Sequence, residues 1–223
     1  MDLFEKLFNM AGSLICHQLP SRTIHADGMA LPVCARDTGI YLGIFTTTFY
    51  LLLMRRFKSE KPPDIFASLV MVLLMAPMII DGFLSYTGII ETSNLRRLLT
   101  GAFFGLPIPF FLIPAAHFKV EGKNTSMVLK NRFELAAVYG MGLGLCYAVW
   151  NGIMPYVVFG LIFISSLLFI LGRMSYTIYV RYGRLRKKAV YILTGVTTIS
   201  VVLFLGFVSE FLLKPIKTML LGN

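Results

Sequence analysis

Residues 65–80 read IFASLVMVLLMAPMII, and the next residue is Asp81. This stretch contains no charged side chain. A helix needs about 20 apolar residues to cross the hydrocarbon layer of a bilayer, and fewer when its flanking side chains reach the headgroups. The stretch therefore predicts a membrane-spanning helix that ends near an interface at Asp81.

The rest of the chain repeats this pattern. Apolar residues make up 57% of the sequence and charged residues 14%, and the mean hydropathy is +0.75. Soluble proteins are roughly a quarter charged, so the composition excludes a soluble globular protein. The apolar stretches predict an all-α transmembrane bundle of about six helices: 38–54, 65–80, 98–116, 135–150, 156–172 and 189–209.

The connections between these spans are short, so residues 1–223 are expected to form a single integral membrane domain. The bundle, 38–209, lies between an N-terminal cap, 1–37, and a tail, 210–223. The start of the cap has apolar residues at helical spacing: Leu3, Phe4, Leu7, Phe8, Ala11, Leu14 and Ile15. This pattern predicts an amphipathic helix, too short and too charged to span, that lies in the interface or packs against the bundle.

The charges indicate an orientation. The chain has 21 Lys and Arg against 11 Asp and Glu, and 14 of the 21 cations fall in the loops 55–64, 117–134 and 173–188. Basic loops contact lipid headgroups and stay in the cytoplasm. We therefore expect a multi-pass protein of the cell membrane with both termini outside, and with the bilayer rather than nucleic acid as its partner.

The cap contains side chains that bind transition metals: Cys16, His17 and Cys34, with Asp37 close by. A divalent transition metal is therefore one expectation for this segment. The spacing matches no compact zinc pattern. A disulfide between Cys16 and Cys34 on an oxidising outer face, or free and redox-active thiols, are the alternatives. Cys146, in the middle of a span, is expected to be a small core residue.

A second polar group surrounds Asp81, because the bilayer penalises an acid at the end of a span unless the acid is paired. Its candidate partners are Arg36, Arg96 and Arg97. Ser93 or Thr92 can cap the helix that begins beside them. Arginines at a helix N-terminus suit an anion such as phosphate. The residues predicted to bind such a lipid or small-molecule anion are Arg36, Arg96, Arg97, Ser93, Asn94 and Thr100. The alternative is an ordinary helix cap with arginines that reach the headgroups.

Small residues and prolines predict how the spans pack. Glycines recur four apart in three spans: Gly39 and Gly43, Gly101 and Gly105, Gly140 and Gly144. Such pairs let helices approach closely, and packing within one chain is favoured over a dimer face. Pro107, Pro109 and Pro114 interrupt the third span. Because broken backbone at membrane depth must be buried in protein or line a wet cavity, the prolines suggest a cavity.

Several of these motifs together resemble one protein family. Cys16-His17-Gln18 is followed by Cys34-Ala-Arg-x-x-Gly-Ile-Tyr-Leu-Gly43, by Asp81-Gly82, and by Ser93-Asn94-x-x-Arg-x-x-Thr-Gly101. The set, over residues 14 to 106, resembles the prokaryotic membrane proteins catalogued as the domain of unknown function numbered two thousand and eighty-five. That family usually reads C-A-R-C where this chain has Asp37 as the fourth residue. The resemblance implies a membrane fold. The acid in place of a third cysteine weakens any metal or redox site that requires that cysteine, although Asp can replace Cys as a ligand to a harder metal. It implies no activity.

Three classes of function remain. A membrane-embedded enzyme would act on a lipid-linked or phosphorylated substrate, with His17, Asp37 and Asp81 as catalytic residues. A transporter or channel would use the proline-broken span and the acids Asp81 and Glu210. A structural or assembly protein would need no chemistry. The enzyme is favoured because the later spans hold few charges at mid-membrane depth.

Overall fold

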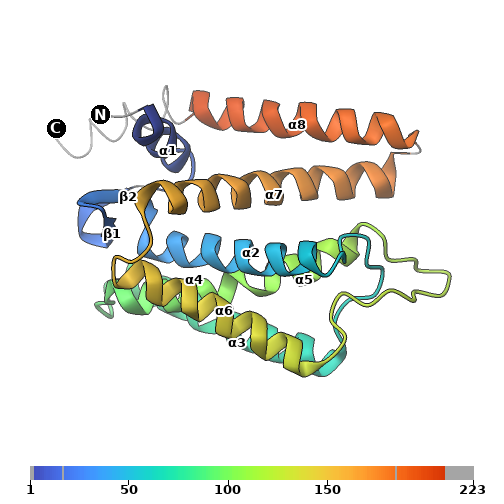
Figure 1. Ribbon diagram of the computed structural model, residues 1–223, viewed down its shortest axis with the longest axis horizontal. Coiled ribbons are helices and arrows are strands. Elements are labelled where there is room, and N and C mark those ends of the chain that lie inside the picture. Colours follow the sequence, from blue (N-terminus) through green and yellow to red (C-terminus); the bar gives the residue numbers. More distant parts are fainter. Residues whose placement is uncertain (1–2, 17, 184, 209–223) are drawn as a thin grey trace.

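The computed structural model describes residues 3–16, 18–183 and 185–208. Long helices run side by side, and a small cap closes one end (Figure 1). Among the described residues, five helical segments are long and apolar enough to cross a membrane: α3 (Ile65–Tyr86), α4 with α5 (Asn94–Gly105 and Pro107–Ala115), α6 (Arg132–Trp150), α7 (Tyr156–Tyr182) and α8 (Lys187–Val208). The all-α membrane bundle is confirmed.

Helix α2 (Ala35–Leu53) forms the remaining predicted span, 38–54, and lies in the centre of the bundle (Figure 1). It packs against α4, α5, α6 and α7, and most of its residues are buried. It is not among the five most apolar segments. Helices rather than lipid cover its buried polar residues Arg36, Thr46 and Thr47, so α2 does not need an apolar surface on every side.

The bundle has two distinct ends (Figure 1). The hairpin end carries the cap, the N-termini of α2, α4 and α7, and the C-termini of α3 and α6. The loop end carries the connections 54–64 and 116–131 and the α7–α8 turn. Arg56 ties the first connection to the start of α6, because its guanidinium binds both carboxylate oxygens of Glu134 at 2.7 and 3.0 Å. The predicted tail 210–223, with Glu210, lies outside the described residues.

Glycines bring α2 and α4 into the most extensive helix contact of the bundle. A Cβ on Gly39 would collide with a backbone carbonyl of α4, and one on Gly101 would collide with a carbonyl of α2. The first two glycine pairs therefore pack within the chain, as predicted. The third pair, Gly140 and Gly144 on α6, differs. A Cβ there would meet no atom of the described residues within 4 Å.

The prolines break the third span at Leu106, between α4 and α5. Leu106, Pro107 and Pro109 are buried, and Thr47 of α2 donates its hydroxyl hydrogen to the Leu106 carbonyl at 2.7 Å. The broken backbone is thus packed against protein, which is one of the two situations that membrane depth allows. It gives no support to the predicted cavity.

The cap begins with the expected amphipathic helix, α1 (Leu3–Ser13). Phe8 is only 2% exposed and lies against Gly160 of α7, whereas Phe4 and Met10 on the other side are 54% and 60% exposed. Burying a phenylalanine side chain contributes about 2–3 kcal/mol, so Phe8 anchors α1 on the bundle. The short helix η1 (Pro20–Arg22) follows.

The cap also contains a β-hairpin that the apolar patterns did not predict. Strands β1 (Thr23–Ala26) and β2 (Met29–Cys34) are antiparallel, with Ala26 opposite Met29. Their turn places Asp27 and Gly28 at φ of 52° and 74°, a conformation that this residue pair tolerates well. The Asp27 carboxylate accepts a hydrogen bond from the backbone N–H of Tyr156 at 2.8 Å. The hairpin thereby caps the start of α7.

Two predicted helix ends are wrong for a shared reason. The expected span 65–80 continues as α3 to Tyr86, so Asp81 lies inside the helix, 0% exposed, rather than at its end. The span 156–172 continues as α7 beyond Arg173, which is buried and donates to the Ile113 carbonyl at 2.6 Å. A charged side chain inside a spanning helix is costly unless it has a partner. The protein supplies that partner in both cases, so both helices continue past the charged residue.

Candidate functional site

Three potential metal ligands meet at the hairpin end. The sulfurs of Cys16 and Cys34 and a carboxylate oxygen of Asp37 all lie within 4.8 Å of one another. Cys16 follows α1, Cys34 ends β2, and Asp37 lies in the first turn of α2. The turn from β2 into α2 is immediate, which brings Cys34 and Asp37 together, and the packing of α1 on β2 adds Cys16. His17, the other predicted ligand, lies outside the described residues.

Both cysteines of the cluster are free thiols, with their sulfurs not joined. The backbone N–H of Cys34 donates to Cys16 Sγ at 3.2 Å, and the protonated Cys34 thiol donates to Asp37 Oδ2 at 3.2 Å. A hydrogen bond from the Cys16 thiol lowers the pKa of Cys34, and the same bond, with burial, raises the pKa of Cys16. Cys34 is thus the first of the two to become a thiolate, the form that binds metals.

Gln18 holds Cys16 in place, a role that the sequence did not indicate. Its amide nitrogen donates to the carbonyls of Asn9 in α1 and Pro32 in β2, at 3.0 and 2.9 Å. Gln18 has a positive φ of 49°, which turns the chain sharply between α1 and the hairpin. A polar side chain that satisfies two carbonyls from different elements fixes their separation. The signal for this role was only the position of Gln18, two residues after Cys16.

Asp81 and two arginines form an ion-pair group beside this cluster. Arg36 Nη2 donates to Asp81 Oδ2 at 2.6 Å, and Arg96 Nε lies 3.0 Å from Asp81 Oδ1. The group joins α2, α3 and α4, since each contributes one residue. The prediction that an arginine partners Asp81 is confirmed, and two of the three candidates do so together.

The third arginine, Arg97, pairs differently. It donates to Asn94 Oδ1 at 3.1 Å and reaches Ser85 Oγ at 3.5 Å. It is 8% exposed, and the charges of Arg36, Asp81 and Cys34 all act on it. Arg97 therefore lies within electrostatic reach of both the ion-pair group and the cysteine cluster.

Other predicted anion ligands have partners in their own helix. Ser93 caps α4 by accepting from the Arg96 N–H at 3.3 Å, as predicted. Thr100 donates its hydroxyl hydrogen to the carbonyls of Arg96 and Arg97 at 2.9 and 3.2 Å. The geometry thus brings together Cys16, Cys34 and Asp37 in one group and Arg36, Asp81 and Arg96 in another. Ser93 and Thr100 serve the helix end.

The comparisons with known proteins fall on this half of the molecule. The family described as "Predicted membrane protein (DUF2085)" matches residues 16–111. An uncharacterized protein of Methanothermobacter thermautotrophicus is 42% identical over 89 residues, which cover 39% of this chain and 74% of the relative. This chain belongs to the DUF2085 family.

A second relative is an uncharacterized protein of Methanocaldococcus jannaschii, 31% identical over 102 residues. That match covers 46% of this chain and 64% of the relative, just under two thirds of its length. No solved structure matches the chain. The matched range 16–111 contains the cysteine cluster and the ion-pair group, whereas α6, α7 and α8 lie beyond it. The family and the five apolar helices make the chain a multi-pass integral membrane protein.

Proposed function

We propose that this protein is a metal-dependent, membrane-embedded enzyme that acts on a phosphorylated or lipid-linked substrate at its hairpin end. The observation that carries the proposal is the convergence of Cys16 Sγ, Cys34 Sγ and an Asp37 oxygen within 4.8 Å. Ligand atoms on one tetrahedral zinc ion lie about 3.7 Å apart, so small side-chain movements suffice. Three protein ligands leave one position for water or substrate, as in catalytic zinc sites.

Arg36 and Arg97 supply the second half of the proposed site. A bound divalent metal supplies Lewis-acid chemistry, either an activated water or a polarised phosphoryl oxygen. Arg36 and Arg97 each have a buried Nε with no partner among the described residues. Buried donors normally have partners, so these two N–H groups are suited to an anionic substrate.

Asp81 acts in this proposal as a positioning residue. Both of its carboxylate oxygens face guanidinium groups, Arg36 at 2.6 Å and Arg96 at 3.0 Å. It is therefore placed to hold the arginines rather than to exchange a proton with substrate. Asp37, whose carboxylate lies beside Cys34, acts as a metal ligand.

Metal analysis tests the proposal directly. The protein is purified in mild detergent without chelators, and its metal content and free thiols are counted. We expect about one divalent transition metal per chain, lost in Cys16→Ala, Cys34→Ala and Asp37→Ala. The matched control is Cys146→Ala, because Cys146 is a buried core cysteine, 1% exposed, outside the cluster. His17→Ala tests the remaining predicted ligand.

Two outcomes overturn the proposal. A protein without metal and with one free thiol per chain has a disulfide between Cys16 and Cys34, and the cap is then structural. Metal that persists in both Cys16→Ala and Cys34→Ala is bound elsewhere. For the substrate class, inorganic phosphate is titrated calorimetrically into the metal-loaded protein. Arg97→Gln should weaken that binding, whereas Arg181→Gln, at the loop end, should not.

A further inference from the structure

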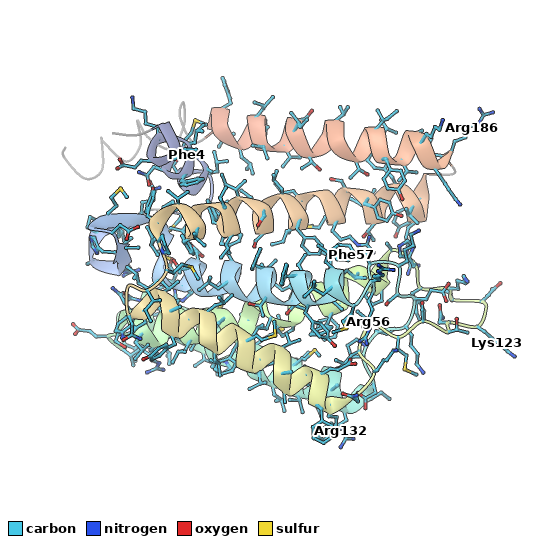
Figure 2. The ribbon with its side chains drawn as sticks, in the orientation of Figure 1. Phe4, Arg56, Phe57, Lys123, Arg132 and Arg186 are labelled. Carbon is cyan, nitrogen blue, oxygen red and sulfur yellow. The ribbon has the colours of Figure 1, made fainter. Side chains whose placement is uncertain are left out.

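The loop end contains a cavity of about 450 Å³, remote from the cysteine cluster. It lies where the first turns of α3 and α6 meet the connections 54–64 and 116–131. Its polar and aromatic lining consists of Lys61, Asp64, Lys130, Asn131, Arg132 and Phe133. Figure 2 shows Arg132 at this end, at the start of α6, on the edge of the bundle.

The charged residues of the lining are three cations and one acid. Within the described residues, no carboxylate lies within 4 Å of the charged groups of Lys61, Lys130 or Arg132. The one acid of the lining, Asp64, caps α3 by accepting from the Ala67 N–H at 3.2 Å. Three cations against one engaged carboxylate give the cavity a positive potential, which attracts anions.

Backbone contacts hold the basic residues in place without a ligand. The Lys61 N–H donates to the Ser126 carbonyl at 2.9 Å, and the Lys61 carbonyl accepts from the Val128 N–H at 3.1 Å. The Lys130 N–H donates to Glu134 Oε2 at 3.0 Å, and that carboxylate is itself held by Arg56. Because these contacts already fix the backbone of Lys61 and Lys130, ligand binding costs less conformational entropy there.

Apolar side chains lie close to these cations, at the starts of α3 and α6. Ile65 is 89% exposed, Phe66 53% and Phe133 86%. The Arg132 guanidinium lies 4.3 Å above the centre of the Phe66 ring, which joins the cationic lining to this apolar surface. Cations above exposed apolar side chains, at the start of membrane spans, match a phosphate headgroup above acyl chains.

We propose that this cavity binds a phosphate group, as carried by an anionic phospholipid or by a soluble phosphate. The three cations contact the phosphate oxygens, and Ile65, Phe66 and Phe133 contact the chains when the ligand is a lipid. The site is separate from the proposed metal site in residues and in position, so either proposal can fail without the other.

Native mass spectrometry of the delipidated protein tests this inference with two probes. Phosphatidylglycerol is the lipid probe, with phosphatidylcholine for comparison, and inorganic phosphate is the soluble probe. The variant is Lys61→Gln/Lys130→Gln/Arg132→Gln. Its control, Lys123→Gln/Lys187→Gln/Lys188→Gln, removes the same charge from the loop end outside the cavity. We expect the cavity variant to bind phosphatidylglycerol at least about tenfold more weakly, and the control to bind it like the wild type.

The two probes distinguish the source of the phosphate. Preference for phosphatidylglycerol over inorganic phosphate identifies a lipid site, and equal binding of the two identifies a site for soluble phosphate. An equal loss in the cavity variant and the control shows diffuse attraction by the whole basic end and overturns the inference. So does unchanged binding in the cavity variant. If that variant unfolds, Lys61→Gln and Lys123→Gln alone provide the same comparison.

Discussion

Asp81 is the acid that the described fold encloses most completely, and both of its neighbours are cations. A buried charge costs several kcal/mol unless it is paired, and the loss of one partner leaves the other charges uncompensated. The carboxylate is 0% exposed and lies within 3.0 Å of both Arg36 and Arg96. Its removal affects three helices at once, because α2, α3 and α4 each supply one member.

We therefore expect Asp81→Ala to lower the free energy of unfolding by about 3–5 kcal/mol. Replacing all three residues, as Arg36→Met/Asp81→Leu/Arg96→Met, should recover part of this loss because no unpaired charge remains. Thermal unfolding in detergent measures both effects. Glu91→Ala, at an exposed acid of the same end, is the control. Equal stability of Asp81→Ala and Glu91→Ala would contradict the role of the ion-pair group.

If the cysteine cluster binds a metal as proposed, Asp37 should influence which metal it prefers. Carboxylate oxygen favours harder ions, and thiolate favours zinc and other soft ions. Asp37→Cys should therefore raise the affinity for Zn²⁺ and lower that for Mn²⁺ relative to the wild type, whereas Asp37→Ala should weaken both. Competition against a chromogenic chelator measures these affinities. A cluster that acts only as a structural contact would bind no metal in any of the three proteins.

His117 provides a test of pH dependence at the loop end. Burial, together with the positive charge of Arg173, lowers its pKa below the ordinary value of 6.5. The unfolded chain takes up the proton more readily, so this histidine makes folding less favourable as the pH falls below about 6.5. Glu60 opposes the effect and Lys58 adds to it.

His117→Gln should therefore lose less stability than the wild type between pH 7.5 and pH 5. Thermal unfolding at the two pH values measures the difference. The control is His25→Gln in β1, because His25 is exposed. If wild type and His117→Gln show the same pH dependence, protonation of His117 contributes nothing to stability.

The sequence predicted the role of a single residue where few side chains could meet a given requirement, such as an ion-pair partner or a helix cap. Asp81 required a cation, and the candidates included both of its partners. Ser93 had the right position to cap α4. Gln18 and Arg173 were not predictable in the same way, because their partners are backbone carbonyls of other elements. A carbonyl is present at every residue, so only the fold selects which one is met.

At the scale of elements, apolar length predicted the spans and missed the hairpin. Strands β1 and β2 are too short for a period of two to stand out, and the available signal was the Asp27-Gly28 pair that forms their turn. The helix ends failed at Asp81 and Arg173, since a sequence shows the charge and not its partner. Glycine spacing predicted close helix packing for two pairs of the three.

The contrast between glycine pairs gives a direct test of that packing. Gly101→Leu should lower the free energy of unfolding by more than about 3 kcal/mol, because a side chain there meets the backbone of α2 and α2 must move. Gly140→Leu should change it by less than about 1 kcal/mol, because a Cβ at Gly140 meets no described atom within 4 Å. Thermal unfolding compares the two variants, and similar losses would contradict the α2–α4 contact.

The whole molecule is polarised between its two ends. Figure 2 places the labelled basic residues Arg56, Lys123, Arg132 and Arg186 at the loop end, opposite Phe4. The loops 55–64, 117–134 and 173–188 hold 14 of the 21 cations. Basic loops are retained in the cytoplasm, so the predicted orientation places the hairpin end, with Cys16 and Cys34, outside.

Labelling of introduced cysteines tests this orientation. A maleimide that does not cross membranes should label Glu91→Cys in intact cells and Lys123→Cys only after permeabilisation, each above the wild-type background. The reverse pattern would place the cysteine cluster in the reducing cytoplasm. There a stable disulfide between Cys16 and Cys34 would be disfavoured, and the thiols would remain available to a metal. With the predicted orientation, oxidation competes with metal binding, so the metal content must be measured on protein in which both thiols are counted.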